Sequence, residues 1–128
     1  MATASMQKST VQRRVVTLVA LDGQGGPAAG AELRFSSVSD DFGNVILGNS
    51  PARIELENVE TTLQVEATFW GEVLAAILPP GLNRHIFHFR TVSKQLHIGP
   101  GTAQCPDGTQ GQPCVDCIVN GSVIRICA

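Results

Sequence analysis

Turn-forming residues interrupt this chain at roughly ten-residue intervals, which restricts it to short extended segments. The interruptions at residues 22–27, 48–51 and 79–80 read DGQGGP, GNSP and PP. Glycine reaches the positive φ values that tight turns need and proline fixes φ, so each cluster ends the element before it. Residues 73–78 (VLAAIL), between Gly71 and Pro79, are too few for a stable helix. The other segments show no helical periodicity, and residues 12–21 are rich in valine, leucine and threonine. The sequence therefore predicts an all-β protein.

Several of these segments alternate apolar and polar residues, the pattern of a strand with one buried face. In residues 53–57 (RIELE), Ile54 and Leu56 are expected to point inward. The pattern predicts seven antiparallel strands in a sandwich, at residues 12–21, 31–38, 45–47, 53–57, 62–70, 73–78 and 84–92. The predicted core is Val16, Leu18, Leu33, Phe35, Ile54, Leu56, Leu63, Val65, Phe69, Ile86 and one of Phe87 and Phe89.

All four cysteines lie outside this predicted sandwich, at Cys105, Cys114, Cys117 and Cys127. This segregation divides the chain into an N-terminal arm (residues 1–11), the sandwich (residues 12–92) and a cysteine-rich C-terminal tail (residues 93–128). Such a short tail cannot bury a core of its own, so it needs a covalent or metal staple.

The tail contains a strong hairpin signal, because Asn120-Gly121 separates two extended segments and suits a two-residue type I′ turn. Counting outward from this turn places Cys114 opposite Cys127, where a disulfide can form. Cys105 and Cys117 are then left as the second pair. Two alternatives remain open: the four thiolates could hold zinc, with Cys114 and Cys117 at the spacing of a zinc knuckle, or the thiols could be free.

Two segments of the sandwich carry a recognisable order of turns. Residues 16–35 (VTLVALDGQGGPAAGAELRF) contain a strand, a turn begun by Asp22, and then Pro27, Gly30 and Ala31; residues 40–47 (DDFGNVIL) contain a second turn ending at Gly43. This order resembles the carboxypeptidase-regulatory-like domain, a transthyretin-like β-sandwich, and bacterial immunoglobulin-like domains share it. The resemblance covers roughly residues 15–90, and it implies a spacer, binding platform or assembly unit.

Other candidate sites have simpler interpretations. His85 and His88 are three residues apart on one predicted strand, which puts them on opposite faces, so they cannot easily share a metal ion. His97 is expected at the surface. Glu55 and Glu57 share one face of their strand and are interpreted as its solvated side. Trp70, the single tryptophan, could anchor a carbohydrate or a partner, but we expect it to cover one end of the core.

The composition narrows the classes of function. The chain has 9 basic and 11 acidic residues and a net charge of −2, so nucleic-acid binding is not expected. No apolar run approaches the length of a membrane-spanning helix, and residues 1–12 do not have the basic and apolar regions of a secretion signal. Nor does the sequence contain a nucleophile elbow, a dinucleotide-binding glycine motif or a P-loop.

These observations predict a non-enzymatic structural or interaction module without a cofactor. It would self-assemble as a homo-oligomer or decorate a larger protein assembly. The alternatives are a zinc-binding module and an accessory domain of a larger enzyme. Disulfides would favour an extracellular or virion-surface location, because they persist in oxidising compartments, whereas zinc would favour the cytoplasm.

Overall fold

The computed structural model describes residues 13–92 and 99–128. The predicted N-terminal arm at residues 1–11 and His97 lie outside these described residues. The described residues form strands without any helix, as the turn pattern predicted. The strands are β1 (Arg14–Leu21), β2 (Glu32–Ser36), β3 (Asp41–Ile46), β4 (Ala52–Leu56), β5 (Leu63–Phe69), β6 (Glu72–Leu78), β7 (Arg84–His88), β8 (Thr102–Gln104), β9 (Gln110–Gly111), β10 (Cys114–Val119) and β11 (Ser122–Cys127).

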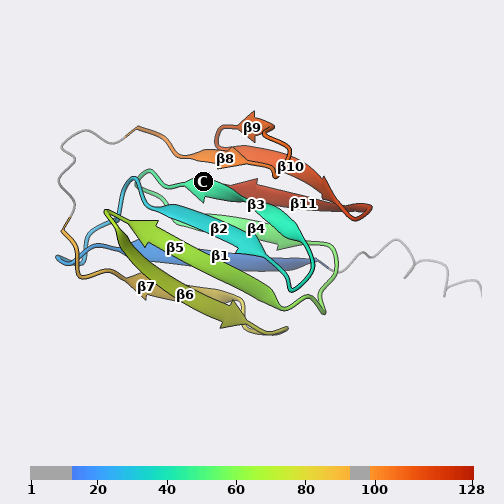
Figure 1. Cartoon of the computed structure of the whole chain (residues 1–128), viewed down its shortest axis with the longest axis horizontal. Coiled ribbons are helices and arrows are strands. Elements are labelled where there is room, and N and C mark those ends of the chain that lie inside the picture. Colours follow the sequence, from blue (N-terminus) through green and yellow to red (C-terminus); the bar gives the residue numbers. More distant parts are fainter. Residues whose placement is uncertain (1–12, 93–98) are drawn as a thin grey trace, which may run out of the picture.

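The strands form two sheets that pack face to face (Figure 1). One sheet has the strand order β10-β11-β4-β1-β7, and the other has the order β6-β5-β2-β3-β8-β9. We call them the five-stranded and the six-stranded sheet. All pairings are antiparallel except that of β1 with β7, which is parallel. The predicted count of seven antiparallel strands therefore describes the arrangement only in part.

The core lies between the two sheets and is mainly aliphatic. Of the predicted core residues, all are buried except Ile86, which is half-buried, and both Phe87 and Phe89 are buried. Small residues and the tail complete the interior. Buried residues that the sequence did not single out include Ala28, Ala31, Phe42, Val45, Ala52, Ala67, Leu78, Ala103, Ile124 and Ile126.

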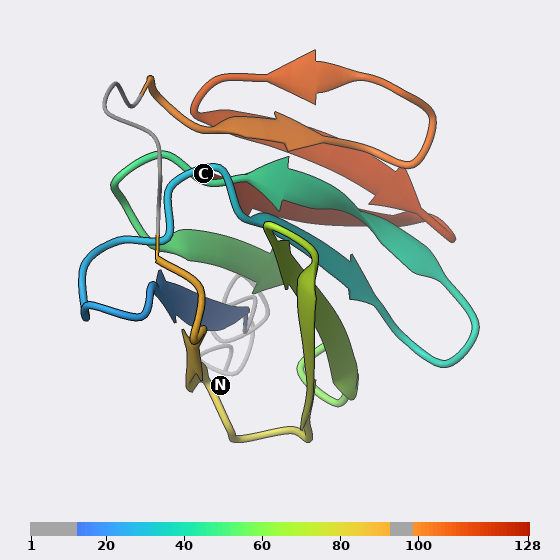
Figure 2. The same ribbon diagram turned by 60° about the vertical axis from the view of Figure 1, so that its left-hand side comes forward.

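The segment assigned to the C-terminal tail contributes strands to both sheets, as Figure 2 also shows. β11 pairs with β4, and Ile126 lies opposite Ile54 in this register. β8 pairs with β3 in the other sheet. The apolar residues of β10 and β11 thus extend the core of the sandwich instead of forming a separate one.

The second turn of the sequence pattern is wrong in part, because β3 already begins at Asp41. Gly43 lies inside this strand with a φ of 128°. A Cβ atom at Gly43 would lie 2.3 Å from the carbonyl oxygen of Gln104. Glycine is therefore required here because β8 approaches the backbone of β3 closely.

The described residues contain no helix that is long and apolar enough to cross a membrane.

Candidate functional site

The four cysteines form two disulfides, Cys105–Cys117 and Cys114–Cys127. These are the two pairs that the hairpin register favoured. Because each sulfur atom is bonded to the sulfur of its partner cysteine, none is available as a thiolate ligand for zinc. The described residues also contain no cluster of three or more histidine, cysteine or acidic side chains arranged to hold a metal ion.

The two disulfides differ in their exposure. Cys105 and Cys117 are 4% and 2% exposed, so their disulfide ties the segment after β8 to β10 inside the core. Cys114 and Cys127 are opposite residues of the β10–β11 hairpin, with Cα atoms 4.0 Å apart. Cys114 is exposed and Cys127 is half-buried. The second disulfide therefore lies on the outer face of the five-stranded sheet.

The hairpin has the predicted turn. Asn120 and Gly121 have φ values of 54° and 82°, as a type I′ turn requires, and Val119 pairs with Ser122 across it. On the outer face, the Nε of Arg125 donates to Oδ1 of Asp116 at 2.8 Å. This hydrogen bond and the charge of Arg125 lower the pKa of the Asp116 carboxyl, since both favour its ionised form.

Strand β6 forms an apolar edge of the six-stranded sheet. Its outward side chains are Val73, Ala75 and Ile77, and Val73 and Ile77 are 56% and 65% exposed. On the opposite face, Leu74 and Ala76 pack against the core but stay half-buried. We call the five residues Val73–Ile77 the β6 edge. It contains neither charge nor proline, the two devices that usually protect an edge strand.

The other edges are protected in different ways. β7 carries Arg84, His85 and His88, and β10 follows Pro113 and carries Asp116. β9 has only two residues. Within the described part of the chain, the β6 edge is therefore the sheet edge best suited to accept another strand.

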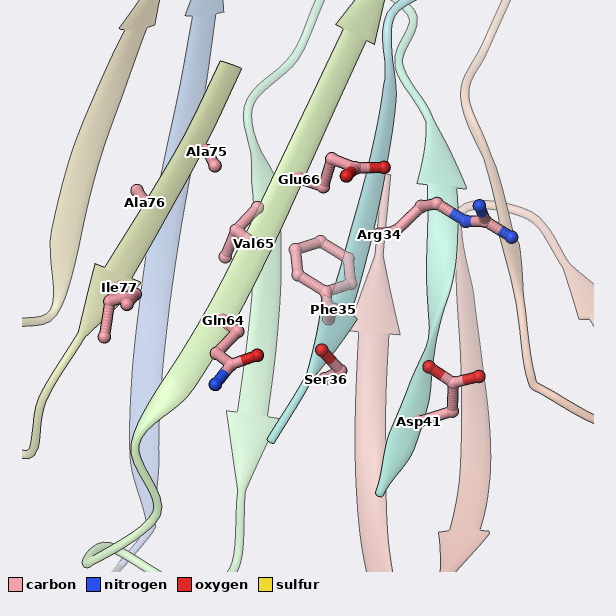
Figure 3. Close-up of a pocket in the computed structure, with 10 residues that line it drawn as sticks. All are labelled: Arg34, Phe35, Ser36, Asp41, Gln64, Val65, Glu66, Ala75, Ala76 and Ile77. Atoms are coloured by element: carbon pink, nitrogen blue, oxygen red, sulfur yellow. The ribbon is translucent and has the colours of Figure 1, made fainter. Parts of the chain in front are cut away.

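A shallow groove adjoins the β6 edge on the outer face of the six-stranded sheet (Figure 3). It has a volume of about 490 Å³ and crosses β6, β5, β2 and β3. Glu66 lies opposite Ala75 on one side and opposite Arg34 on the other. The surface thus changes from apolar at β6 to charged at β5 and β2. This change from apolar to charged surface suits a partner that places an apolar strand against the β6 edge and polar side chains in the groove.

A buried arginine holds the C-terminal end of β6. Arg14, on β1, is only 4% exposed, and burial lowers the pKa of its guanidinium. The guanidinium has no carboxylate partner among the described residues and instead donates to neutral oxygens. They are Oδ1 of Asn83 and the main-chain oxygens of Thr61, Leu78, Pro79 and Leu82.

A carboxylate holds the other end of β6. Oε1 of Glu72 accepts hydrogen bonds from the main-chain N–H groups of Arg90 and Thr91, at 2.9 and 3.0 Å. It also accepts one from the Thr91 hydroxyl, at 2.8 Å. The N–H of Arg90 has the largest effect on the pKa of Glu72 and lowers it, and Thr91 acts in the same direction. Arg14 and Glu72 together fix β6 beside β7 while its central residues remain free at the edge.

Trp70 stands at the turn between β5 and β6, with a φ of 50°. Its side chain is 54% exposed and contacts only the edge of Phe69 in the ring pairs described, with centroids 6.4 Å apart. The expectation that Trp70 covers the end of the core is therefore wrong. The neighbouring rings of Phe69 and Phe89, with centroids 5.3 Å apart, are buried instead.

The remaining candidate residues lie apart from one another. His85 packs against Phe87 on the core side of β7, whereas His88 is exposed on the other side, as their spacing predicted. Glu55 lies on the outer face of β4, with Oε1 4.0 Å from Nη1 of Arg13. Sequence reasoning missed Arg14, although its alternation with Val16 and Leu18 placed it on the inward face.

In comparisons with family models, with curated proteins and with solved structures, the chain matches none.

Proposed function

We propose that this chain is a non-enzymatic β-sandwich module that assembles with a second copy of itself through the β6 edge. The observation that carries this proposal is the β6 edge, an uncharged part of an exposed edge strand with Val73 and Ile77 on its outer face. An open edge offers main-chain hydrogen bonds to a further strand, and the exposed side chains supply apolar area.

The sequence of the β6 edge supports pairing with its own copy. An antiparallel pairing around a two-fold axis at Ala75 would place Val73 opposite Ile77 of the second copy. Both contacts of such a symmetric interface are then apolar, and no like charges meet. The added strand would also cover Leu74 and Ala76, which are only half-buried. If the register continued beyond the strand, Trp70 would approach Pro80 of the second copy.

The disulfides support an extracellular location for this assembly. Two disulfides are typical of proteins in oxidising surroundings. We therefore place the module outside the reducing cytosol, on a cell or virion surface, where a repeated sheet-edge contact would join copies or attach the module to a larger structure.

Sedimentation velocity over a series of protein concentrations tests the proposed contact. We expect the wild-type chain to form a dimer, and Val73→Lys with Ile77→Lys to raise the dimer dissociation constant by about tenfold or more. Ile118→Lys is the matched control, since Ile118 is 79% exposed on another edge strand, β10. Circular dichroism should show that every variant remains folded.

The emission of Trp70, the only tryptophan, provides a second measurement. We expect the emission to shift to shorter wavelength as the dimer forms, because the exposed indole would become covered. A wild-type chain that remains monomeric at millimolar concentration would refute the proposal. So would a dimer that Ile118→Lys dissociates and the double β6 variant does not.

A further inference from the structure

The outer disulfide lies in a row of side chains that crosses the five-stranded sheet. In the strand registers, Cys114 is opposite Cys127, Cys127 is opposite Arg53, and Arg53 is opposite Thr17. Thr17 is opposite Arg84, which completes the row. This row contains two arginines and no carboxylate, so the disulfide lies at the end of a locally positive row.

The carboxylates of this face belong to the neighbouring row and have other partners. Asp116 accepts two hydrogen bonds from Arg125, at 2.8 and 3.2 Å. Glu55 lies opposite Arg125 and 4.0 Å from Arg13. Arg53 has no ion pair among residues 13–92 and 99–128. Its charge is therefore available to an anion at the disulfide.

The disulfide is also accessible. A groove of about 420 Å³ on the outer face is lined by both cysteines, by Arg53 and Arg125, and by one carboxylate residue, Glu55, which lies opposite Arg125. A small molecule can reach the sulfur atoms from this groove. The other disulfide offers no such access, because Cys105 and Cys117 are buried.

We propose that Cys114–Cys127 is a site of reversible thiolation by a low-molecular-mass thiol that carries a carboxylate. The thiolate of this molecule attacks Sγ of the exposed Cys114, the bond between Cys114 and Cys127 breaks, and its electron pair leaves on Sγ of Cys127. The product is a mixed disulfide on Cys114 and a thiolate on Cys127. A second thiol molecule then displaces the first as a free disulfide and reduces Cys114.

Arg53 has two effects on this exchange. Its positive charge attracts the carboxylate of the incoming thiol, and it stabilises the thiolate that leaves on the adjacent Cys127. The hairpin remains held after the exchange, because Cys105–Cys117 and the pairing of β11 with β4 do not depend on the outer disulfide.

The experiment compares mercaptopropionate, mercaptoethanol and cysteamine, which are anionic, neutral and cationic thiols, at equal thiolate concentration on the intact chain. Samples are quenched with acid and alkylated, and the modified cysteines are located by peptide mass mapping. We expect Cys114 and Cys127 to react before Cys105 and Cys117, with the first adduct on Cys114. The anionic thiol should react about fivefold faster than the cationic one, since two unit charges about 4 Å apart in bulk water interact by about 1 kcal/mol.

Arg53→Gln is the informative variant, and Arg84→Gln is its matched control in the same row. We expect Arg53→Gln to bring the rates of the anionic and cationic thiols close together, and Arg84→Gln to leave most of the difference. Added salt should reduce the difference in the wild-type chain. Equal reactivity of the two disulfides would overturn the proposal, as would a thiol preference that persists in Arg53→Gln.

Discussion

The guanidinium of Arg14 donates a hydrogen bond to the main-chain oxygen of Leu78 at 3.2 Å, and so joins β1 in one sheet to the end of β6 in the other. A buried arginine without a carboxylate partner is costly, and it is tolerated here because five neutral oxygens accept hydrogen bonds from its guanidinium. The contact makes Arg14 a structural residue that holds the β6 edge in position.

Replacing Arg14 by methionine should destabilise the protein by about 3 kcal/mol, because several main-chain oxygens would lose their buried donor. Urea unfolding measures this change. Arg13→Ala is the control, since Arg13 is exposed and its one ion pair among the described residues, with Glu55, is long at 4.0 Å. Arg13→Ala should lower the free energy of unfolding by less than about 0.5 kcal/mol. Equal effects of the two substitutions would contradict the role given to Arg14.

The contribution of Glu72 should depend on pH. The pKa of Glu72 is lowered in the folded protein, chiefly by the N–H of Arg90. Its stabilising effect is therefore complete above the pKa of the unfolded chain and is lost as the pH falls through the lower, folded value. Unfolding of Glu72→Gln and wild type at several pH values should show a difference that is largest near neutral pH and shrinks under acid. Glu60→Gln, an exposed position outside the strands, should cost less than Glu72→Gln at neutral pH. A difference that grows under acid would contradict this assignment.

Gly43→Ala should destabilise the protein by more than about 2 kcal/mol, because the new Cβ would collide with the Gln104 carbonyl. Gly25→Ala separates this collision from backbone strain. Gly25 also has a positive φ, of 84°, but a Cβ there would meet nothing within 4 Å. We expect Gly25→Ala to cost about 1 kcal/mol. Thermal unfolding measures the loss of stability in both variants. Equal losses would show that the Gln104 carbonyl does not exclude a Cβ atom at Gly43.

The two disulfides should differ in their effect on stability. Their sequence separations are 12 and 13 residues, so loop closure alone predicts nearly equal contributions of about 3 kcal/mol. The burial of Cys105 and Cys117 makes the two contributions unequal. The double variant Cys105→Ala and Cys117→Ala also leaves a cavity in the core, so it should cost more than Cys114→Ala with Cys127→Ala. Guanidinium unfolding of both double variants provides the comparison, and the opposite order would be evidence against the buried position of Cys105.

Features determined by neighbours in the sequence could be predicted from it. Asn120-Gly121 specifies its own turn, and this turn sets the register that brings Cys114 opposite Cys127. Alternation within each strand likewise identified most of the core, because side chains on one strand point in turn to opposite faces.

Features determined by distant segments could not be predicted from the sequence. Nothing near Thr102 indicates that β8 will pair with β3, and nothing in β7 indicates that it will lie parallel to β1. Trp70 was misplaced for a different reason. It follows the inward Phe69, so alternation puts Trp70 on the outer face, and the turn that begins there leaves its side chain 54% exposed. The β6 edge depends on the order of the strands, so it too becomes visible only in the structure.

The position of β11 between β10 and β4 has a consequence for how the protein is made. Ile126 must pair with Ile54, a residue synthesised long before it, so the five-stranded sheet cannot close until the hairpin has left the ribosome. Contacts between such distant segments make folding slow. Until then, the edge of β4 that later pairs with β11 is open, although β1 can already pair with its other edge. Such an open edge favours association with other nascent chains.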